Sequence, residues 1–550
     1  MVLDLSSSTN PNHVRPINQQ NLLSLYNRKA PSFCGAPLNQ LSNDKFESSN
    51  AQKNNNVVSF GSSFHKPEFT VDAMAPLLID NDIEMAKFKN DIKYAKEKGV
   101  KSISVDVWSG VVQKAGEEKF DWSIYEKMFS VLKQNDMGIL VNFSEHPCGG
   151  NIGDSVNIPT SEWKWDYLAK QLGVDSIKND NPEIEKTLKQ KFKDDLRYKN
   201  EHGDYIADEI PIWYDEIMMP KSRKFMEEFK KHFMDNPNSL INIKDSVKEI
   251  HTSCGPAGEL RYPTYGENIK GAEFPTRGWF IGYSEGGKAA FRKDMQAKYD
   301  NNIAKLNYEW ETNLKSFDDI LPPHNNAPEM GRATGFVESK DYANTKYGRD
   351  FVDFLNNRLL KHGENKVTMA HEIFKDTSIP IAVKYPGIHW QIANKNTPRI
   401  AEIVAGLINT DITRENDFGY KPFFDMVKSV KDKFKNSDTI AYFTCLEMKN
   451  DLNGVSKGMP TNSCAEFLVD WVSKAAKSRG IVIKGENACE DNLRNEESWN
   501  MLKHNAWEGY DGVTFLRVGA LKNNMHFENF MNWVKGDLLK KGKELFRMVA

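Results

Sequence analysis

Two glutamates, each placed where an apolar run meets a glycine-framed turn, are the residues of this chain best suited to chemistry. Glu259 lies in the segment CGPAGELRYP (residues 254–263), and Glu486 follows the β-branched run of GIVIKGENA (residues 480–488). Glycoside hydrolysis needs such a pair, because one carboxylic acid protonates the leaving oxygen while one carboxylate activates water or attacks carbon. The pair alone leaves two alternatives open, since such acids could also bind a metal or be neutralised by lysine and arginine.

The alternation of short apolar runs with amphipathic segments predicts that repeated βα units position these acids. Met85, Phe88, Ile92 and Ala95 share one helical face after the first apolar run, and Gly99 can end that helix. Eight apolar runs are expected to be strands: 73–78, 102–108, 138–143, 247–254, 379–385, 439–445, 480–484 and 512–516. The pattern predicts an α/β fold, a (β/α)8 barrel whose long βα-loop insertions form a smaller lobe over its C-terminal face.

Polar residues stand at or near the C-terminal ends of most of these runs. They are Asp106, His146, Glu259, Lys384, Thr444, Glu486 and Arg517. In a barrel of parallel strands these ends meet at one mouth, where active sites are built. Each residue taken singly could be a buried polar group satisfied by the backbone, but together they predict one pocket.

The composition of the whole chain narrows the class of partner. The 550 residues carry 73 basic and 76 acidic side chains, a net charge of -3, so no field favours a polyanion such as nucleic acid. No apolar stretch approaches eighteen residues, so no membrane role is expected. A neutral polymer fits better, and the 12 tryptophans, 18 tyrosines and 31 phenylalanines offer faces on which sugars stack, although most must serve the core.

The cysteines and the N-terminal segment bear on the compartment. The six cysteines are widely spaced, with no C-x-x-C pair and no zinc-type cluster, which predicts free thiols in a reducing compartment such as the cytoplasm. Residues 1–62 are rich in Ser, Asn, Gln and Pro and are expected to be a disordered extension before a catalytic domain at 63–550. The extension lacks the apolar segment of a secretory signal, while plastid or other targeting stays open.

Six ordered motifs give a more specific identification. They are VDVW (105–108), HPCGGNIGDSVNIP (146–159), GPAGELRYP (255–263), GIHW (387–390), FTCLEM (443–448) and GENA (485–488). Over about 69–546 they resemble the β-amylase family, glycoside hydrolase family 14. The resemblance implies an exo-acting barrel enzyme without cofactor, which releases maltose from the non-reducing ends of α-1,4-glucans such as amylose, starch, glycogen and maltooligosaccharides.

The same resemblance assigns the two glutamates. Glu259 resembles the general acid, and Glu486 resembles the general base that activates water in an inverting, single-displacement reaction. The acid must stay protonated near neutral pH, which requires desolvation or a nearby negative charge. The base should be ionised and held by donors, for which Lys384 and Asn487 are the candidates.

Further matched positions are expected to bind the glucan. They are Asp106, His146, Asp154, Lys384, His389, Thr444, Asn487 and Arg517. Asp106 suits sugar hydroxyls because one carboxylate accepts two O–H bonds. Thr444 can orient the attacking water, and Arg517 is expected to pair with an acid of the site. Asp154 lies on a segment, 149–156, that resembles the family's mobile lid, and Cys148 beside it suggests sensitivity to thiol reagents.

Several departures from the family pattern keep other hypotheses open. Ser109, Pro147 and Cys489 replace residues usual in the family, and Gln113 stands where bacterial members have a calcium-binding acid, so no metal is predicted. The first alternative is a catalytically silent glucan sensor on the same barrel, although none of the acids is lost. The second is a retaining endo-glycosidase, whose carboxyls would lie ~5 Å apart rather than the ~6.5–9.5 Å of inverting enzymes.

Overall fold

A computed structural model describes residues 69–149, 154–237, 239, 241–323 and 335–538 of the chain. The expected extension at 1–62 lies outside the described residues. So do residues 150–153 of the segment expected to be a lid. Among the described helices, none has the length and apolar character needed to span a membrane.

Eight parallel strands close into a barrel, in which the first strand pairs with both the second and the last. The strands are β1 (Thr70–Met74), β2 (Ser102–Trp108), β3 (Gly138–Ser144), β4 (Val247–Thr252), β5 (Ile381–Tyr385), β6 (Thr439–Phe443), β11 (Val482–Glu486) and β12 (Gly512–Phe515). The predicted (β/α)8 barrel is confirmed. Short antiparallel pairs stand apart from it, formed by β7 (Asn450–Asp451) with β10 (Ser463–Cys464) and β8 (Val455–Ser456) with β9 (Met459–Pro460).

The strand boundaries differ from the apolar runs in an informative way. The first strand was expected at 73–78 but spans Thr70–Met74. Asp72 interrupts the apolar pattern and is nevertheless 1% exposed inside the strand. Likewise β11 begins later than expected and includes Glu486 as its last residue. Hydrophobicity misplaces these boundaries because polar side chains point into this barrel.

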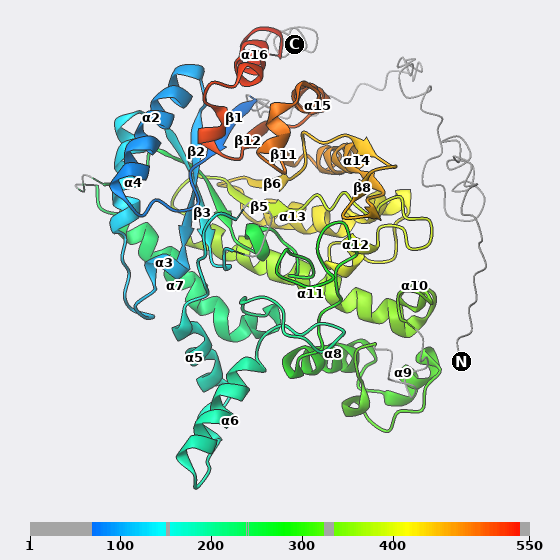
Figure 1. Cartoon of the computed structure of the whole chain (residues 1–550). Helices are drawn as coiled ribbons and strands as arrows, with labels where there is room; N and C mark the ends of the chain where they lie inside the picture. Colours follow the sequence, from blue (N-terminus) through cyan, green and yellow to red (C-terminus); the bar gives the residue numbers. More distant parts are fainter. Residues whose placement is uncertain (1–68, 150–153, 238, 240, 324–334, 539–550) are drawn as a thin grey trace, which may run out of the picture.

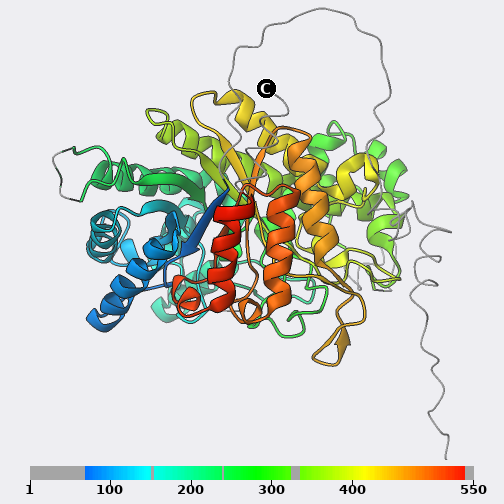
Figure 2. The ribbon, with the colours of Figure 1, turned by 90° about the horizontal axis from the view of Figure 1, so that it is seen from above.

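Helices surround the barrel, and the longest connections, β3–β4 and β4–β5, carry the insertions. The helices are α2 (Asp82–Lys98), α3 (Ser109–Val112), α4 (Ser123–Gln134), α5 (Glu162–Gln171), α6 (Pro182–Asp194), α7 (Asp215–Phe233), α8 (Glu285–Lys298), α9 (Ile303–Trp310), α10 (Asp341–Asn344), α11 (Lys346–Ile373), α12 (Ile400–Val404), α13 (Lys421–Lys433), α14 (Ala465–Lys477), α15 (Glu496–Glu508) and α16 (Met525–Trp533). Figure 1 shows α5 and α6 projecting from the barrel as an arm. Figure 2 shows α14, α15 and α16 side by side on the outside of the barrel.

The first helix illustrates how sequence sets these elements. Asn81 caps α2 by accepting a hydrogen bond from the backbone N–H of Glu84 (2.9 Å). Phe88 and Ile92 on its predicted apolar face are fully buried. Gly99 ends the helix at φ 99°, a left-handed conformation that glycine adopts without strain. The predicted helix and its glycine stop are therefore confirmed.

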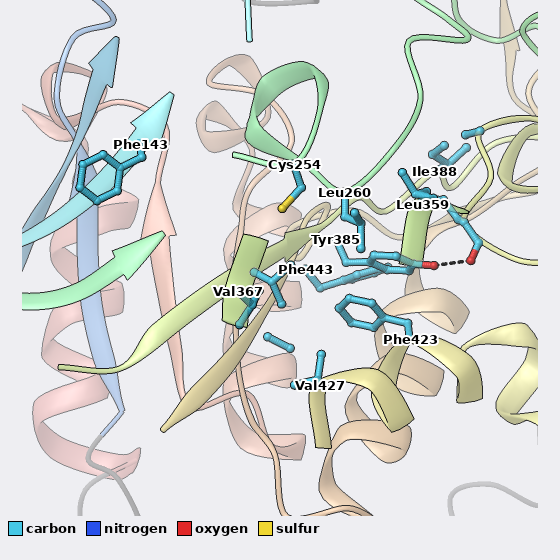
Figure 3. Packing of buried hydrophobic residues seen from close by; sticks show 14 of the residues in the cluster. Phe143, Cys254, Leu260, Leu359, Val367, Tyr385, Ile388, Phe423, Val427 and Phe443 are labelled. Atoms are coloured by element: carbon cyan, nitrogen blue, oxygen red, sulfur yellow. Dashed lines mark hydrogen bonds between the residues drawn. The ribbon is translucent and has the colours of Figure 1, made fainter. Parts of the chain in front are cut away.

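The apolar core lies mainly between the barrel and its helices. Tyr385 at the end of β5 stacks on Phe423 of α13, with ring centroids 3.9 Å apart. The Tyr385 hydroxyl donates a hydrogen bond to the Leu407 carbonyl, drawn as a dashed line in Figure 3. This packing fixes the β5 end, from which Lys384 reaches the barrel mouth.

The interior of the barrel is unusually polar, since such interiors are normally filled by layers of branched apolar side chains. Glu249 of β4 forms an ion pair with Lys484 of β11 and also accepts hydrogen bonds from Tyr442 (2.6 Å) and His251 (3.2 Å). Lys484 and Glu249 are 7% and 4% exposed. This charge network ties β4, β6 and β11 together beneath the mouth.

Candidate active site

The turn after β4 delivers Glu259 to the barrel mouth. A 3-10 turn at Pro256–Gly258 reverses the chain immediately before it. A Cβ at Gly255 would lie 2.3 Å from the carbonyl oxygen of Arg261, so only glycine fits there. Leu260, which directly follows Glu259, donates its backbone N–H to the Lys384 carbonyl (2.8 Å). The glycine-framed turn therefore fixes Glu259 beside the end of β5.

Glu259 has the environment that a general acid requires. Burial raises the pKa of its carboxyl, and the negative charge of Glu486 adds to the rise. Arg261 opposes this by donating from Nε to Glu259 Oε2 (2.8 Å), and the charge of Lys384 opposes it as well. The pKa stays above its usual value, which favours the protonated form.

Glu486 has a direct ion-pair partner. Its Oε1 lies 2.9 Å from the Lys384 Nζ, and the two side chains are 5% and 12% exposed. Burial alone would lower the pKa of Lys384, but the charges of Glu486 and Asp106 raise it, so the ammonium stays charged. A buried carboxylate paired with a charged ammonium is kept ionised, as a base that takes a proton from water must be.

Asp106 and Arg517 form a second charged pair at the mouth, 3.6 Å apart. Asp106 Oδ1 also accepts hydrogen bonds from the Ser144 hydroxyl (2.9 Å) and from Asn142 (3.2 Å). Burial would raise the pKa of Asp106, but the charges of Arg517 and Lys384 hold it below its usual value. Arg517 thus contacts an acid of the site, as the sequence predicted.

The two histidines of the site are neutral. Burial lowers the pKa of His146 and that of His389 to about 4. The Nδ1 of His146 lies 2.8 Å from the Ser253 hydroxyl, and the Nδ1 of His389 lies 2.8 Å from the Ser463 hydroxyl. With Nδ1 engaged, the Nε2 of each imidazole is left to exchange one hydrogen bond with a ligand.

The side chains of Thr444 and Asn487 form hydrogen bonds with the protein backbone. The Thr444 hydroxyl accepts the backbone N–H of Gly387 (2.7 Å). Asn487 accepts the N–H of Leu516 (2.9 Å) and donates to the Cys489 carbonyl (3.0 Å). The expectation that Asn487 holds the Glu486 carboxylate is wrong, because its amide is used to bridge the segments that follow β11 and β12.

The described ends of the predicted lid are closed by backbone pairing. Cys148 and Ile158 exchange two N–H···O bonds of 2.9 Å, and Asp154 accepts the N–H of Gly149 (2.8 Å). Cys148 is 4% exposed, and burial together with the charge of Asp154 raises the pKa of its thiol to about 12. The thiol is therefore protonated and covered when the segment has this conformation. The five described cysteines form no disulfide with one another, in agreement with the prediction of thiols.

A cleft of about 520 Å³ opens beside the Glu259 turn. Its lining includes Pro256, Tyr265, Cys148, Ala207 and Glu209. The Tyr265 ring meets the Trp390 ring edge to face, with centroids 4.9 Å apart. Such a groove of aromatic and polar side chains fits an extended polar chain.

Gln113 and the two acids near it, Glu117 and Glu118, contact other groups of the protein. The amide of Gln113 donates to the Glu117 carbonyl (2.8 Å), and the side chains of Glu117 and Glu118 are ion-paired with Lys221 and Lys224. Within the described ranges, no group of three His, Cys, Asp or Glu side chains is arranged to hold a metal ion.

Sequence reasoning missed three kinds of residue around the site. Arg261 lies within one of the quoted motifs, but the sequence analysis assigned it no role. A signal was available, because side chains two residues apart in an extended segment lie on the same side, and Arg261 follows Glu259 by two residues. Glu145 and Lys366 form a buried pair behind His146 (2.6 Å) that links distant segments. Glu209 gave no signal, because nothing local distinguishes it from a surface acid.

Comparisons with known proteins show which family the chain belongs to. Residues 73–544 match the family model described as glycosyl hydrolase family 14. "Beta-amylase" from Cytobacillus firmus is 31% identical over 83% of this chain and 84% of its own length. "Thermophilic beta-amylase" from Thermoanaerobacterium thermosulfurigenes is 30% identical over 83% of this chain and 72% of its own.

A solved structure extends the likeness to three dimensions. The catalytic domain of β-amylase from Paenibacillus polymyxa matches with a TM-score of 0.67 and 28% identity, covering 86% of this chain and 99% of that one. The match thus reaches from the sequence to the barrel and its insertions. The chain belongs to glycosyl hydrolase family 14, and it is a glycoside hydrolase.

Proposed function

We propose that this protein is a β-amylase that hydrolyses α-1,4-glucosidic bonds from the non-reducing ends of starch- or glycogen-type glucans and releases β-maltose with inversion. One observation carries the proposal. Burial favours the protonated form of Glu259, while Lys384 holds Glu486 as its ion-pair partner at 2.9 Å, so the two carboxyls of one mouth are prepared for opposite roles.

The reaction follows from these two environments. Glu259 donates its proton to the glycosidic oxygen as the C–O bond breaks. Glu486 takes a proton from a water molecule, whose oxygen bonds to the anomeric carbon on the face opposite the leaving group, so the configuration inverts. Each turnover leaves Glu259 ionised and Glu486 protonated, and exchange with solvent restores both.

The remaining polar residues bind and orient the glucan. Asp106, kept ionised by Arg517, is suited to accept hydroxyls of the terminal sugar. Neutral His146 and His389 each offer Nε2 to a sugar hydroxyl. Asp154 acts as part of the lid that covers the bound glucan. Thr444 orients the attacking water, whereas Asn487 and Arg517 support the site through the contacts they make with the protein.

End-blocked maltoheptaose tests the exo-action. We expect maltose from free maltoheptaose and from a form modified at its reducing end, but none from a form whose non-reducing glucose is blocked. Cleavage of the blocked form would show internal attack and overturn the exo-acting proposal. A wild type that binds maltoheptaose without cleaving it would instead favour a silent glucan sensor.

A further inference from the structure

The cleft of about 520 Å³ has not yet been given a role, since none of the described residues assigned to the reaction lines it. Its volume is typical of ligand-binding sites. The cleft nevertheless borders the barrel mouth. Pro256, which lies in the turn immediately before Glu259, lines it, and so do Pro147 and Cys148, which directly follow His146 in the chain. The cleft can therefore hold one part of a ligand whose other end lies at the mouth.

The cleft lies on the side of the general acid. Tyr265 lines it, and the Tyr265 ring stacks on the guanidinium of Arg261 (4.2 Å), whose Nε donates to Glu259. A general acid stands beside the glycosidic oxygen, and the leaving part of the glucan continues from that oxygen. When maltose is removed from the non-reducing end, the leaving part is the reducing-end side of the chain. The cleft is therefore placed to receive that side.

A tight hairpin, residues 199–205, contributes three side chains to the cleft lining, those of Asn200, Asp204 and Tyr205. Lys199 and Tyr205 pair as an antiparallel bridge at its base. Across the turn, the Asn200 N–H donates to the Asp204 carbonyl (2.9 Å), and the Asn200 Oδ1 accepts the Asp204 N–H (2.9 Å). These bonds hold the three side chains in fixed positions before any ligand binds.

The Tyr205 ring is a large aromatic surface that the protein leaves 42% exposed. Its orientation is fixed at both ends, because the hydroxyl donates to Asp195 and the Lys199 Nζ lies 4.7 Å from the ring centre. A rigid, half-exposed aromatic ring that lines a cleft offers a flat apolar face on which the C–H groups of a sugar ring can pack.

The two polar side chains of the hairpin complement the hydroxyls of a sugar. Asn200 is 2% exposed, and its Oδ1 is engaged within the turn, whereas its Nδ2 donates no hydrogen bond to any described residue. Asp204 is exposed, and among the described residues its carboxylate has no ion-pair partner. The amide can therefore donate to a sugar oxygen, and the carboxylate can accept two O–H groups.

We propose that Asn200, Asp204 and Tyr205 form an outer subsite that binds a glucose unit on the reducing-end side of the glucan. The inference rests on the proposed function, from which it takes the neutral glucan and the exo direction. Short oligosaccharides are cleaved without reaching this subsite, whereas longer chains gain its contacts. These contacts are the same before and during bond cleavage, so they lower KM for long chains and leave kcat unchanged.

The test compares maltose release from maltotetraose, maltoheptaose and short-chain amylose by wild type, Tyr205→Ala, Tyr205→Phe and Asp204→Ala. In Tyr205→Ala we expect KM for amylose to rise about tenfold, with kcat and the KM for maltotetraose changed less than about twofold. Tyr205→Phe keeps the ring and should behave as wild type. The matched control is Tyr308→Ala, because Tyr308 is 84% exposed on α9 and does not line the cleft.

The outcomes separate the two proposals. A wild type that releases no maltose refutes the proposed function and this inference with it. An active wild type whose KM for amylose is unchanged in Tyr205→Ala refutes only this inference, as does a loss of equal size for maltotetraose. If Tyr205→Ala does not fold, Asp204→Ala decides: a rise in KM of at least about threefold for amylose but not for maltotetraose supports the subsite, and an unchanged KM overturns it.

Discussion

Replacement of Lys366 by methionine should reveal how much the ion pair behind the site contributes to stability. Lys366 on α11 donates to Glu145 Oε1 (2.6 Å), while Glu145 Oε2 accepts the Ser222 hydroxyl (2.8 Å) and lies 3.7 Å from the Lys164 Nζ. The Glu145 and Lys366 side chains are 13% and 7% exposed. Lys366→Met therefore leaves a buried carboxylate with only part of its compensation.

The magnitude follows from the titration of Glu145. Burial would raise its pKa, but Lys366 and Lys164 lower it from 4.5 to about 2. That difference corresponds to about 3 kcal/mol of folding free energy, which is present above the unfolded pKa and lost as pH falls toward 2. Removing one partner of a buried ion pair generally costs about 3–5 kcal/mol of stability, which agrees with the value obtained from the pKa of Glu145.

Urea unfolding at pH 7 measures the loss, with Lys361→Met as the matched control. Lys361 lies on the same helix, pairs with Glu364 (2.7 Å) and is 66% exposed, so its removal should change stability by under about 0.5 kcal/mol. We expect Lys366→Met to lose about 3 kcal/mol at pH 7 and the gap to wild type to narrow as pH falls below 4.5. Equal stability of the two variants would refute the reasoning.

Three further predictions concern the mouth of the barrel. Asp106→Asn keeps the shape but weakens the hold on Arg517 and on sugar hydroxyls, so kcat/KM for maltopentaose should fall about 10- to 100-fold; an unchanged value would remove Asp106 from the binding site. Asp154→Asn should lower kcat at least about tenfold in the same assay, and a normal kcat would argue against a closing role. Iodoacetamide at pH 7.5 should inactivate wild type slowly, and more slowly with maltose bound, because the Cys148 thiol is covered and its pKa is about 12. Cys148→Ser should resist the reagent, and its inactivation at the wild-type rate would exclude Cys148.

The fold was predictable because a parallel barrel repeats one local pattern. Each strand is a short apolar run and each helix has an apolar face, as α2 shows with its glycine stop. The boundaries of β1 and β11 were not predictable from hydrophobicity. Asp72 and Lys484 point into a polar interior, and their burial depends on partners such as Glu249 that come from elsewhere in the chain.

The site was predictable only in part, for a related reason. Residues at strand ends, such as Asp106 and Lys384, could be assigned to one mouth because the barrel brings those ends together. Contacts made by insertions could not, because Glu209 and Lys366 lie far along the chain from the groups they face. Asn487 was misassigned because its neighbour in sequence, Glu486, is not the group that its amide contacts.

The anomeric form of the first product tests the central claim most directly. Proton NMR of a maltooligosaccharide digest, recorded before mutarotation, distinguishes the two anomers of the released sugar. We predict early β-maltose from wild type and none from Glu259→Gln or Glu486→Gln, because each variant removes one of the two proton transfers. Early α-anomer, or β-maltose that survives either substitution, would contradict the assignment of Glu259 as acid and Glu486 as base.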